Sequence, residues 1–172
     1  LISTYIDITR NTFDYISIIG RGGFGKVWKI YHKQFKKYYA MKEMSKPKII
    51  DKKSEHSIKA ERDLLSRINH KFLINMHFAF QDNDNLYLVI DLLTGGDLRY
   101  HICKHKRFTE EQTKFFIACI ILGLEYCHYN SIIHRDIKPE NLVLNERGYV
   151  HITDFGIAKI QQPNNCKETS GT

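Results

Sequence analysis

Several features of secreted and membrane proteins are missing from the sequence. Its four cysteines form no CxxC pair and have no metal-finger spacing, so we expect reduced thiols rather than disulfide bonds. The longest charge-free run in the helical part, Phe115 to Leu124, is about half of the roughly 20 residues that cross a bilayer. Residues 1–12 contain Asp7 and Arg10, where a signal peptide needs an apolar segment. The sequence therefore predicts a cytoplasmic protein without a transmembrane segment, and leaves a lipid anchor open.

Acidic residues are outnumbered by basic ones, 19 to 26, and the formal net charge is +7. A basic protein can bind nucleic acid, but the basic residues here do not interleave with aromatic ones as a nucleic-acid platform requires. We therefore favour a basic face that is solvated or that meets phosphate groups. With 172 residues, 42% of them hydrophobic, the chain is large enough for one domain or two small lobes.

The first half of the chain has the pattern of a β-sheet with one helix. Short runs of aromatic and β-branched residues predict five strands: Phe13 to Gly20, Lys26 to His32, Lys37 to Glu43, Met76 to Phe80 and Leu86 to Asp91. A basic loop from Ser45 to Lys53 follows the third strand. After it, apolar residues at helical spacing predict a helix from Ser54 to Ile68.

The second half reads as mainly helical. Asp97 to Asn130 has no strand pattern, and Thr109 with Gln112 forms a capping box at the start of a long helix. The apolar residues of that helix go nearly all round it, so we expect it to be buried. The segment from Leu142 to Lys159 returns to short strands.

These elements predict an α+β fold with two lobes. The predicted boundaries are an N-terminal flank at 1–12, a β-rich lobe at 13–90, a hinge at 91–96 and part of a helical lobe at 97–172. Ligands favour the junction between such lobes.

A glycine cluster from Gly20 to Val27 fits the pattern GxGxxGxV. The spacing alone also opens dinucleotide-binding folds, and an ordinary turn between two strands is a further alternative. A dinucleotide fold needs a helix after the last glycine, whereas Val27 to Tyr31 is strand-like. The glycines therefore predict a hairpin flap, whose N–H groups approach phosphate oxygens where a side chain would collide.

Lys42 lies on the third predicted strand, on the same face as Ala40. A lone lysine on a strand is usually a surface residue. Glu61, however, falls on the apolar stripe of the predicted helix, where a carboxylate needs a cation. A Lys42–Glu61 ion pair would align the ammonium group with the phosphates of a nucleotide, and the small Ala40 leaves room for a flat ring.

The stretch from Ile133 to Asn141 gathers an acid, a base, an amide, an imidazole and a guanidinium between two apolar runs. Asp136 would accept or orient the proton of an attacking hydroxyl group, and Lys138 would neutralise charge on a phosphoryl group. Asn141 and Asp154 offer a neutral and a charged oxygen, which are ligands that Mg²⁺ prefers. These residues indicate phosphoryl transfer, a reaction that depends on positioning and electrostatics.

His134 and Arg135 have supporting roles in this interpretation. We expect His134 to be a packed, hydrogen-bonded core residue rather than a base. Arg135 cannot lose its proton, so we expect it to hold a nearby acid.

Jointly, these motifs resemble the signature of eukaryotic protein kinases, in the family's order. They are Gly20 to Val27, Lys42, Glu61, His134 to Asn141 and Asp154 to Gly156. The resemblance extends from Phe13 to Thr172. Lys138 within HRDIKPEN resembles the serine/threonine type. NLYLVIDLLTGGDL and VHITDFGIAK resemble the AGC group, and DLLTGGDLRYHI looks most like its YANK-type members.

The resemblance implies a bilobal protein kinase fold that transfers the γ-phosphoryl group of ATP to a serine or threonine hydroxyl, with Mg²⁺ or Mn²⁺. It assigns catalysis to Asp136, Lys138, Lys42 and Glu61, and metal binding to Asn141 and Asp154. It assigns ATP binding to Ile19, Gly20, Gly22, Gly25, Val27, Ala40, Lys42, Ile90, Asp91, Leu93, Asp97, Val143 and Thr153. Within that set, Ile90 corresponds to the gatekeeper, Asp91 to Leu93 to the hinge, and Asp97 to the ribose contact.

Other residues resemble supporting elements of the family. Leu65, Met76, His134 and Phe155 resemble the apolar stack that links the lobes of an active kinase. Glu140, and Asp97 in part, resemble the acids that favour basic residues upstream of the phosphorylated hydroxyl, which predicts protein substrates with that feature. The missing aromatic–basic platform separately predicts no nucleic-acid partner.

The sequence departs from the family pattern in its last part. It begins without Met and ends at Thr172, before an Ala-Pro-Glu element, so we expect it to be part of a longer chain. Counting back from Gly171, the position of the activating phosphothreonine is Glu168, whose carboxylate would supply a fixed charge to Arg135. Thr169 is the rival site of phosphorylation, because the loop is about one residue longer than usual.

A pseudokinase, which binds nucleotide or partners without transferring phosphate, is the alternative from another class. The presence of the full set of signature residues argues against it, because degenerate kinases usually lack at least one. That set is Lys42, Glu61, Asp136, Asn141 and Asp154.

Overall fold

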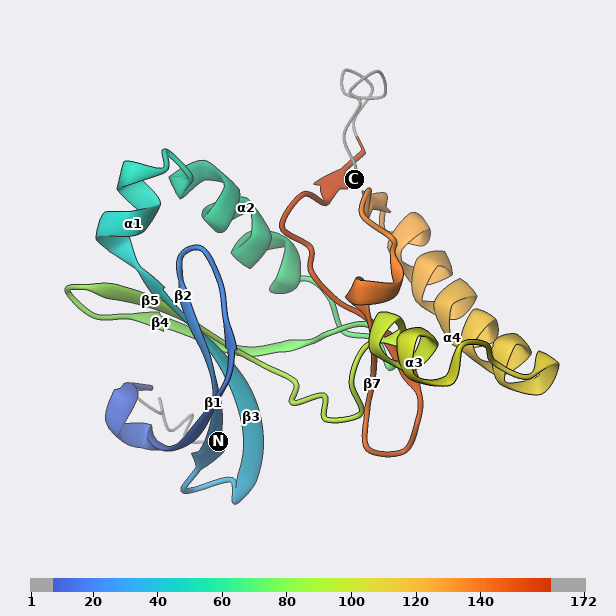
Figure 1. Ribbon diagram of the computed structural model, residues 1–172. Coiled ribbons are helices and arrows are strands. Elements are labelled where there is room, and N and C mark those ends of the chain that lie inside the picture. Colours follow the sequence, from blue (N-terminus) through green and yellow to red (C-terminus); the bar gives the residue numbers. More distant parts are fainter. Residues whose placement is uncertain (1–7, 162–172) are drawn as a thin grey trace, which may run out of the picture. The chain divides into compact units, whose positions relative to one another are not determined.

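The computed structural model of the chain describes residues 8–161 (Figure 1). The chain divides into two compact units. Unit 1 consists of Leu1–Glu55 and Met76–Leu92, and unit 2 of His56–Asn75 and Leu93–Thr172. Residues 56–75 therefore group with the second unit, whereas the sequence pattern placed them in the first lobe; the predicted domain boundaries stay a prediction.

Unit 1 is built on a five-stranded antiparallel sheet with the strand order β1-β2-β3-β5-β4 (Figure 1). The strands are β1 (Phe13–Arg21), β2 (Gly25–His32), β3 (Lys37–Ser45), β4 (Met76–Gln81) and β5 (Asn85–Ile90). All five strands were predicted. The short 3₁₀ helix η1 (Arg10–Thr12) precedes the first of them.

One face of this sheet carries the core of unit 1. Strand alternation places six buried apolar residues together: Phe13, Ile30, Tyr39, Met41, Tyr87 and Val89. Aromatic rings fill the space between strands, as where Phe80 stacks on Phe13 and on Tyr87. The core thus holds the backbone of β2 and β3, which bear the glycine flap and Lys42.

The predicted basic loop from Ser45 to Lys53 is wrong in part, because it contains the helix α1 (Lys46–Asp51). Pro47 is tolerated in the first helical turn, where backbone N–H groups have no partner within the helix. Burial of Ile49 provides the apolar contact that holds this short helix.

Unit 2 contains the main helices. They are α2 (Glu55–Leu65), whose first residue still belongs to unit 1, α3 (Leu98–His105) and α4 (Glu110–Tyr129). Two small antiparallel ladders accompany them: β6 (Ile132–Ile133) pairs with β9 (Lys159–Ile160), and β7 (Leu142–Leu144) with β8 (Val150–Ile152). The 3₁₀ helix η2 (Pro139–Asn141) leads directly into β7.

The region from Asp97 to Asn130 is not one continuous helical stretch. Lys106 has a φ of +69° after α3 ends, and α4 begins after the N-cap residue Thr109. The predicted capping box is confirmed. The Thr109 hydroxyl accepts from the Gln112 N–H at 3.2 Å, and the side-chain oxygen Oε1 of Gln112 accepts from the Thr109 N–H at 3.0 Å.

The prediction that α4 is buried is wrong for one side of the helix within the described structure. Cys119, Ile120, Gly123 and Cys127 are buried, whereas the opposite side includes Ile121, which is 58% exposed. Gly123 permits the close approach on the buried side, since a Cβ there would lie 3.1 Å from side-chain atoms of Leu73 and Ile152. No helix within residues 8–161 is long and apolar enough to cross a membrane.

The capping box gives a test of the fold. We expect Thr109→Ala to lower the free energy of unfolding by about 1 kcal/mol, because the N–H of Gln112 in the first turn of α4 loses its hydroxyl acceptor. Thr113→Ala is the matched control: its hydroxyl bonds only to the Thr109 carbonyl inside the helix, and we expect a change within about 0.5 kcal/mol. Urea unfolding measures both, and equal losses in the two variants would contradict the role of the cap.

Candidate active site

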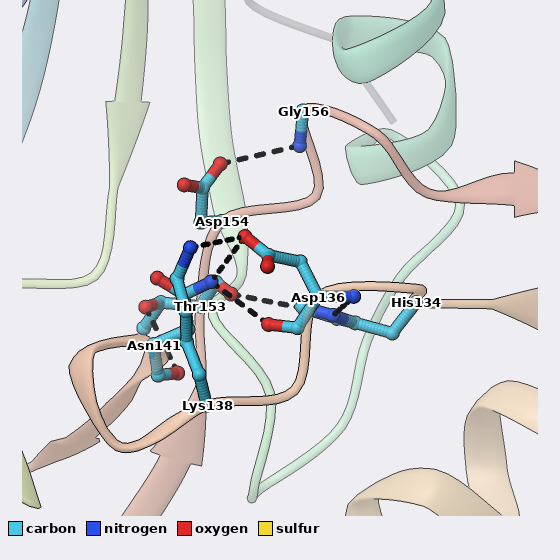
Figure 2. Close-up of polar contacts among 7 residues, drawn as sticks. All are labelled: His134, Asp136, Lys138, Asn141, Thr153, Asp154 and Gly156. Atoms are coloured by element: carbon cyan, nitrogen blue, oxygen red, sulfur yellow. Dashed lines mark hydrogen bonds and ion pairs between the residues drawn. The ribbon is translucent and has the colours of Figure 1, made fainter. Parts of the chain in front are cut away.

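The centre of the candidate site is the carboxylate of Asp136, in the loop between β6 and η2 (Figure 2). The Lys138 ammonium lies 2.8 Å from Asp136 Oδ2. The amide Nδ2 of Asn141 donates to the same Oδ2 at 3.0 Å and to the main-chain oxygen of Asp136 at 2.9 Å. Two predicted catalytic residues and one predicted metal ligand therefore lie together in unit 2.

The charge state of Lys138 follows from this contact. The hydrogen bond with Asp136 raises the pKa of Lys138 above its ordinary value. Lys138 therefore keeps its proton in this contact.

Asn141 and Asp154 come together through the β7–β8 ladder. Asn141 precedes β7, Thr153 and Asp154 follow β8, and Leu142 pairs with Ile152. The carbonyl oxygen of Asn141 accepts from the N–H of Thr153 at 2.8 Å and from its hydroxyl at 3.1 Å. Antiparallel pairing thus places Asn141 beside Thr153, each one residue beyond the ladder, and Asp154 is the next residue along the chain.

The donor set of Asn141 and Asp154 fits a hard cation. The amide nitrogen of Asn141 bonds to Asp136, so its Oδ1 is the atom that a metal ion would meet. Asp154 has a φ of +62°, and its Oδ1 accepts from the Gly156 N–H at 3.3 Å. No group of three His, Cys, Asp or Glu side chains within residues 8–161 could hold a metal ion alone. Two protein oxygens suit Mg²⁺, which usually completes its shell with water and substrate phosphates.

His134 is a buried structural residue, as predicted, and is 2% exposed. The Asp136 N–H donates to His134 Nδ1 at 3.3 Å, which leaves Nε2 to donate to the Thr153 carbonyl at 2.9 Å. Its ring meets Phe155 edge to face, with centroids 4.8 Å apart. Burial lowers the pKa of His134, and the neutral ring links the Asp136 loop to the segment after β8.

Arg135 also joins the Asp136 loop to the segment after β8. Its φ is +68°, and its guanidinium donates from Nε to the carbonyl oxygen of Ile157 at 2.7 Å and from Nη2 to the same oxygen. The predicted partners Glu168 and Thr169 lie outside the described residues, so their contact with Arg135 stays a prediction.

The glycine flap in unit 1 is a hairpin, as predicted, rather than the start of a helix. β1 and β2 pair across the glycines, and the N–H of Gly22 donates to the carbonyl of Gly25 at 3.0 Å. A Cβ at Gly25 would lie 1.9 Å from the carbonyl oxygen of Glu43, so only glycine fits there. Ile19, beside the flap, is 49% exposed.

Ala40 and Lys42 lie on β3, where they pair with Ile90 and Leu88 of β5. Glu61 is 7% exposed on the buried stripe of α2, as the sequence pattern predicted. Lys42 belongs to unit 1 and Glu61 to unit 2, so the ion pair between them stays a prediction.

The predicted nucleotide contacts after β5 also divide between the two units. In unit 1, the carboxylate of Asp91 lies 2.7 Å from Nε2 of His77. In unit 2, Asp97 caps α3 by accepting from the Tyr100 N–H at 2.7 Å, and it pairs with Val143. Asp97 therefore has a structural role that the sequence pattern did not indicate.

Lys52 is a contact of the flap that sequence reasoning missed. Its ammonium donates to the carbonyl oxygen of Gly23 at 3.1 Å and lies 5.2 Å from the centroid of the Phe24 ring. The only sequence signal was the basic composition of residues 45–53, which does not identify the lysine that turns toward the glycines.

The lowered pKa of His134 gives a pH test. Because the native pKa lies below about 6.5, the unfolded chain binds more protons as the pH falls, so stability is full above about pH 6.5 and lost below it. We expect His134→Gln to flatten the decline in unfolding free energy between about pH 7.5 and about pH 5. His32 and His70, whose pKa values burial also lowers, retain part of the slope. Exposed His56→Gln is the control, and a slope that changes equally in both variants would contradict the assignment.

Known proteins match most of the chain. A family model of the protein kinase domain matches residues 13–172. A probable serine/threonine-protein kinase of Dictyostelium discoideum is 44% identical over 158 residues, which cover 92% of this chain and 35% of that protein. The serine/threonine-protein kinase sgk-1 of Caenorhabditis elegans is 45% identical over 152 residues, 88% of this chain and 33% of that protein.

A human protein matches the chain with similar identity and coverage. Serine/threonine-protein kinase 32B of Homo sapiens is 43% identical over 154 residues, which cover 90% of this chain and 37% of that protein. The chain therefore spans about a third of the length of the curated relatives that it matches.

Proposed function

The chain belongs to the protein kinase domain family, and from this premise we propose that its protein is an ATP- and Mg²⁺-dependent serine/threonine protein kinase. The observation that carries the proposal is the hydrogen-bonded group of Asp136, Lys138 and Asn141 beside Asp154. The similarity to serine/threonine kinases over about nine-tenths of the chain supports the same reaction class.

Asp136 is the proposed acceptor of the substrate proton. The oxygen of a serine or threonine hydroxyl forms a bond to the γ-phosphorus of ATP, and the bond from that phosphorus to the bridging oxygen breaks. The hydroxyl proton passes to the Asp136 carboxylate, and ADP leaves with the electron pair of the broken bond. Lys138, held at 2.8 Å from Asp136, neutralises charge on the phosphoryl oxygens during this exchange.

Asn141 Oδ1 and the Asp154 carboxylate are the proposed metal ligands. A bound Mg²⁺ ion would withdraw charge from the phosphate oxygens. The two bonds that the Asn141 amide donates to Asp136 hold the amide in one orientation, so the protein positions its Oδ1 before any metal binds. The main-chain carbonyl of Asn141, which accepts from Thr153, holds the backbone of the same residue in place.

The proposed ATP contacts come from both units. Unit 1 supplies the flap, Lys42, Ile90 and Asp91. Unit 2 supplies Leu93, Asp97, Val143 and Thr153. We propose that backbone N–H groups of the flap and the Lys42 ammonium bind the phosphates, with Glu61 as the partner of Lys42. Mn²⁺ would substitute for Mg²⁺ at the same oxygens.

The finer assignments rest on motif resemblance. We propose membership of the AGC group, which similarity to sgk-1 and to a RAC family kinase homolog of Dictyostelium discoideum supports. Within it, the segment DLLTGGDLRYHI favours the YANK type. We further propose protein substrates with basic residues upstream of the acceptor, no nucleic-acid partner and a cytoplasmic location.

Phosphoryl transfer provides the direct test of the proposal. We expect Lys42→Met and Asp136→Asn in the full-length protein to lose at least about 100-fold in kcat with Mg-ATP and a basic Ser/Thr peptide, since each removes a positioned charge. Lys59→Met and Asp51→Asn are matched controls on exposed positions of α2 and α1, and they keep their activity. If the unsubstituted protein and the four variants all showed the same background rate, the enzyme proposal would fail and a nucleotide-binding pseudokinase would be the better interpretation.

We also propose that Glu168 replaces an activating phosphate by facing Arg135. One carboxylate is a weaker partner than a phosphate, so we expect Glu168→Ala to lower kcat several-fold and Glu168→Gln to do the same. Thr169→Ala should have no effect in protein that carries no phosphate. Unchanged kcat in Glu168→Ala, together with a loss in Thr169→Ala, would assign the regulatory position to Thr169 instead.

A further inference from the structure

A cavity of about 750 Å³ lies in unit 2 between α3, the start of α4 and β7. Its size falls within the range of about 300 to 1,000 Å³ that is usual for ligand sites. None of the catalytic or nucleotide residues proposed above lines it. The cavity therefore needs an explanation of its own.

One side of the cavity is apolar. The Phe108 ring meets the Phe116 ring edge to face, with centroids 5.0 Å apart. Leu144 of β7, which is 8% exposed, also lines it. Two aromatic rings and a leucine form a surface that suits an aliphatic side chain.

The other side of the cavity is basic. His101 and His105, one turn apart on α3, stack their rings with centroids 6.0 Å apart, and Arg107 follows them. The guanidinium of exposed Arg107 makes no hydrogen bond or ion pair with any other residue among 8–161. Exposed Lys104 and Lys106 flank His105 and add positive charge.

The acidic group at the cavity does not cancel this charge. Glu110 Oε1 lies 2.6 Å from the ammonium of Lys114, one turn further along α4, so its carboxylate is already paired. The first turn of α4 is not itself an anion site, because Thr109 and Gln112 satisfy each other's N–H groups. The attraction for a negative ligand therefore comes from the exposed cations Arg107, Lys104 and Lys106.

We propose that this cavity is a docking site for an acidic peptide segment of a partner protein that carries an aliphatic anchor. The anchor packs against Phe108, Phe116 and Leu144, and the flanking carboxylates face the Arg107 guanidinium and the ring of His105. Charge complementarity selects this occupant, because a basic or purely apolar peptide would leave the Arg107 guanidinium without a partner.

The site is joined to the catalytic segment within unit 2. His101 donates from Nε2 to the Gly95 carbonyl at 2.7 Å, and the N–H of Gly95 donates to the carbonyl of Leu144 at 2.8 Å. On the same helix, Arg99 lies 3.9 Å from Glu140 of η2. A segment docked in the cavity would therefore lie against β7, which follows η2 and the Asp136 loop directly, and against α3, whose Arg99 faces η2. This position is suited to recruiting a substrate or regulator.

Fluorescence anisotropy with the full-length protein tests the proposal. The probe is a labelled, end-capped hexapeptide, Glu-Asp-Leu-Glu-Leu-Asp. One comparison peptide carries Lys at each acidic position, and another carries Ala at each Leu. We expect the acidic probe to bind, Arg107→Glu to weaken it at least about tenfold, and Lys71→Glu, an equal charge reversal at an exposed position away from the cavity, to change it less than about twofold.

Further arms keep the test decisive. His105→Ala alters an exposed side chain and should weaken binding without unfolding the chain, and the Ala-containing peptide should bind more weakly than the probe. No binding of the acidic probe, equal affinity for the Lys-containing peptide, or equal losses in Arg107→Glu and Lys71→Glu would overturn the proposal. Phosphorylation of an unrelated short peptide should be unchanged in Arg107→Glu, so failure here leaves the proposed kinase activity intact.

Discussion

Asn141 makes hydrogen bonds to two different segments, and the geometry of the candidate site depends on both sets. Its side-chain amide donates to the carboxylate and main-chain oxygens of Asp136, whereas its carbonyl oxygen accepts from the N–H and hydroxyl of Thr153. Asp154 follows Thr153 directly. One residue, only 6% exposed, thus fixes the proposed base and the second metal ligand relative to its own Oδ1. Polar groups that are buried and fully bonded hold a single geometry, which catalysis by positioning requires.

Local features of the site and fold were predictable from the sequence because few residues determine each of them. The capping box needs only Thr109 and Gln112, and the hairpin flap follows from glycines placed between two strand-like runs. The burial of Glu61 followed from helical periodicity. Its pairing with Lys42 stays a prediction. The types and spacing of residues in the Asp136 loop predict phosphoryl-transfer chemistry, and that assignment stays a proposal. The structure places Asp136, Lys138 and Asn141 together in unit 2.

Other features depend on tertiary packing that a sequence pattern does not encode. The exposure of Ile121 contradicts the expected burial of α4, because the apolar residues around the helix do not reveal how many sides are covered. The helix α1 was not predicted because proline usually interrupts helices. Pro47 is compatible with α1 because it lies in the first turn, and the burial of Ile49 stabilises this short helix. Lys52 is one of several lysines in its segment, and the sequence does not show which of them contacts Gly23. The cavity proposed as a docking site is lined by residues of α3, α4 and β7, so no single segment of the sequence predicts it.

The central claim is that the Asn141 network positions a metal-binding pair beside the proposed catalytic base. A crystal structure of the full-length protein with Mg²⁺ and a non-hydrolysable ATP analogue tests it most directly. We expect density for Mg²⁺ bound to Asn141 Oδ1 and to the Asp154 carboxylate, with Asn141 still donating to Asp136 and with Asp136 facing the γ-phosphate. A metal ion held by other residues, or an Asn141 side chain turned away from Asp136 in the complex, would contradict it.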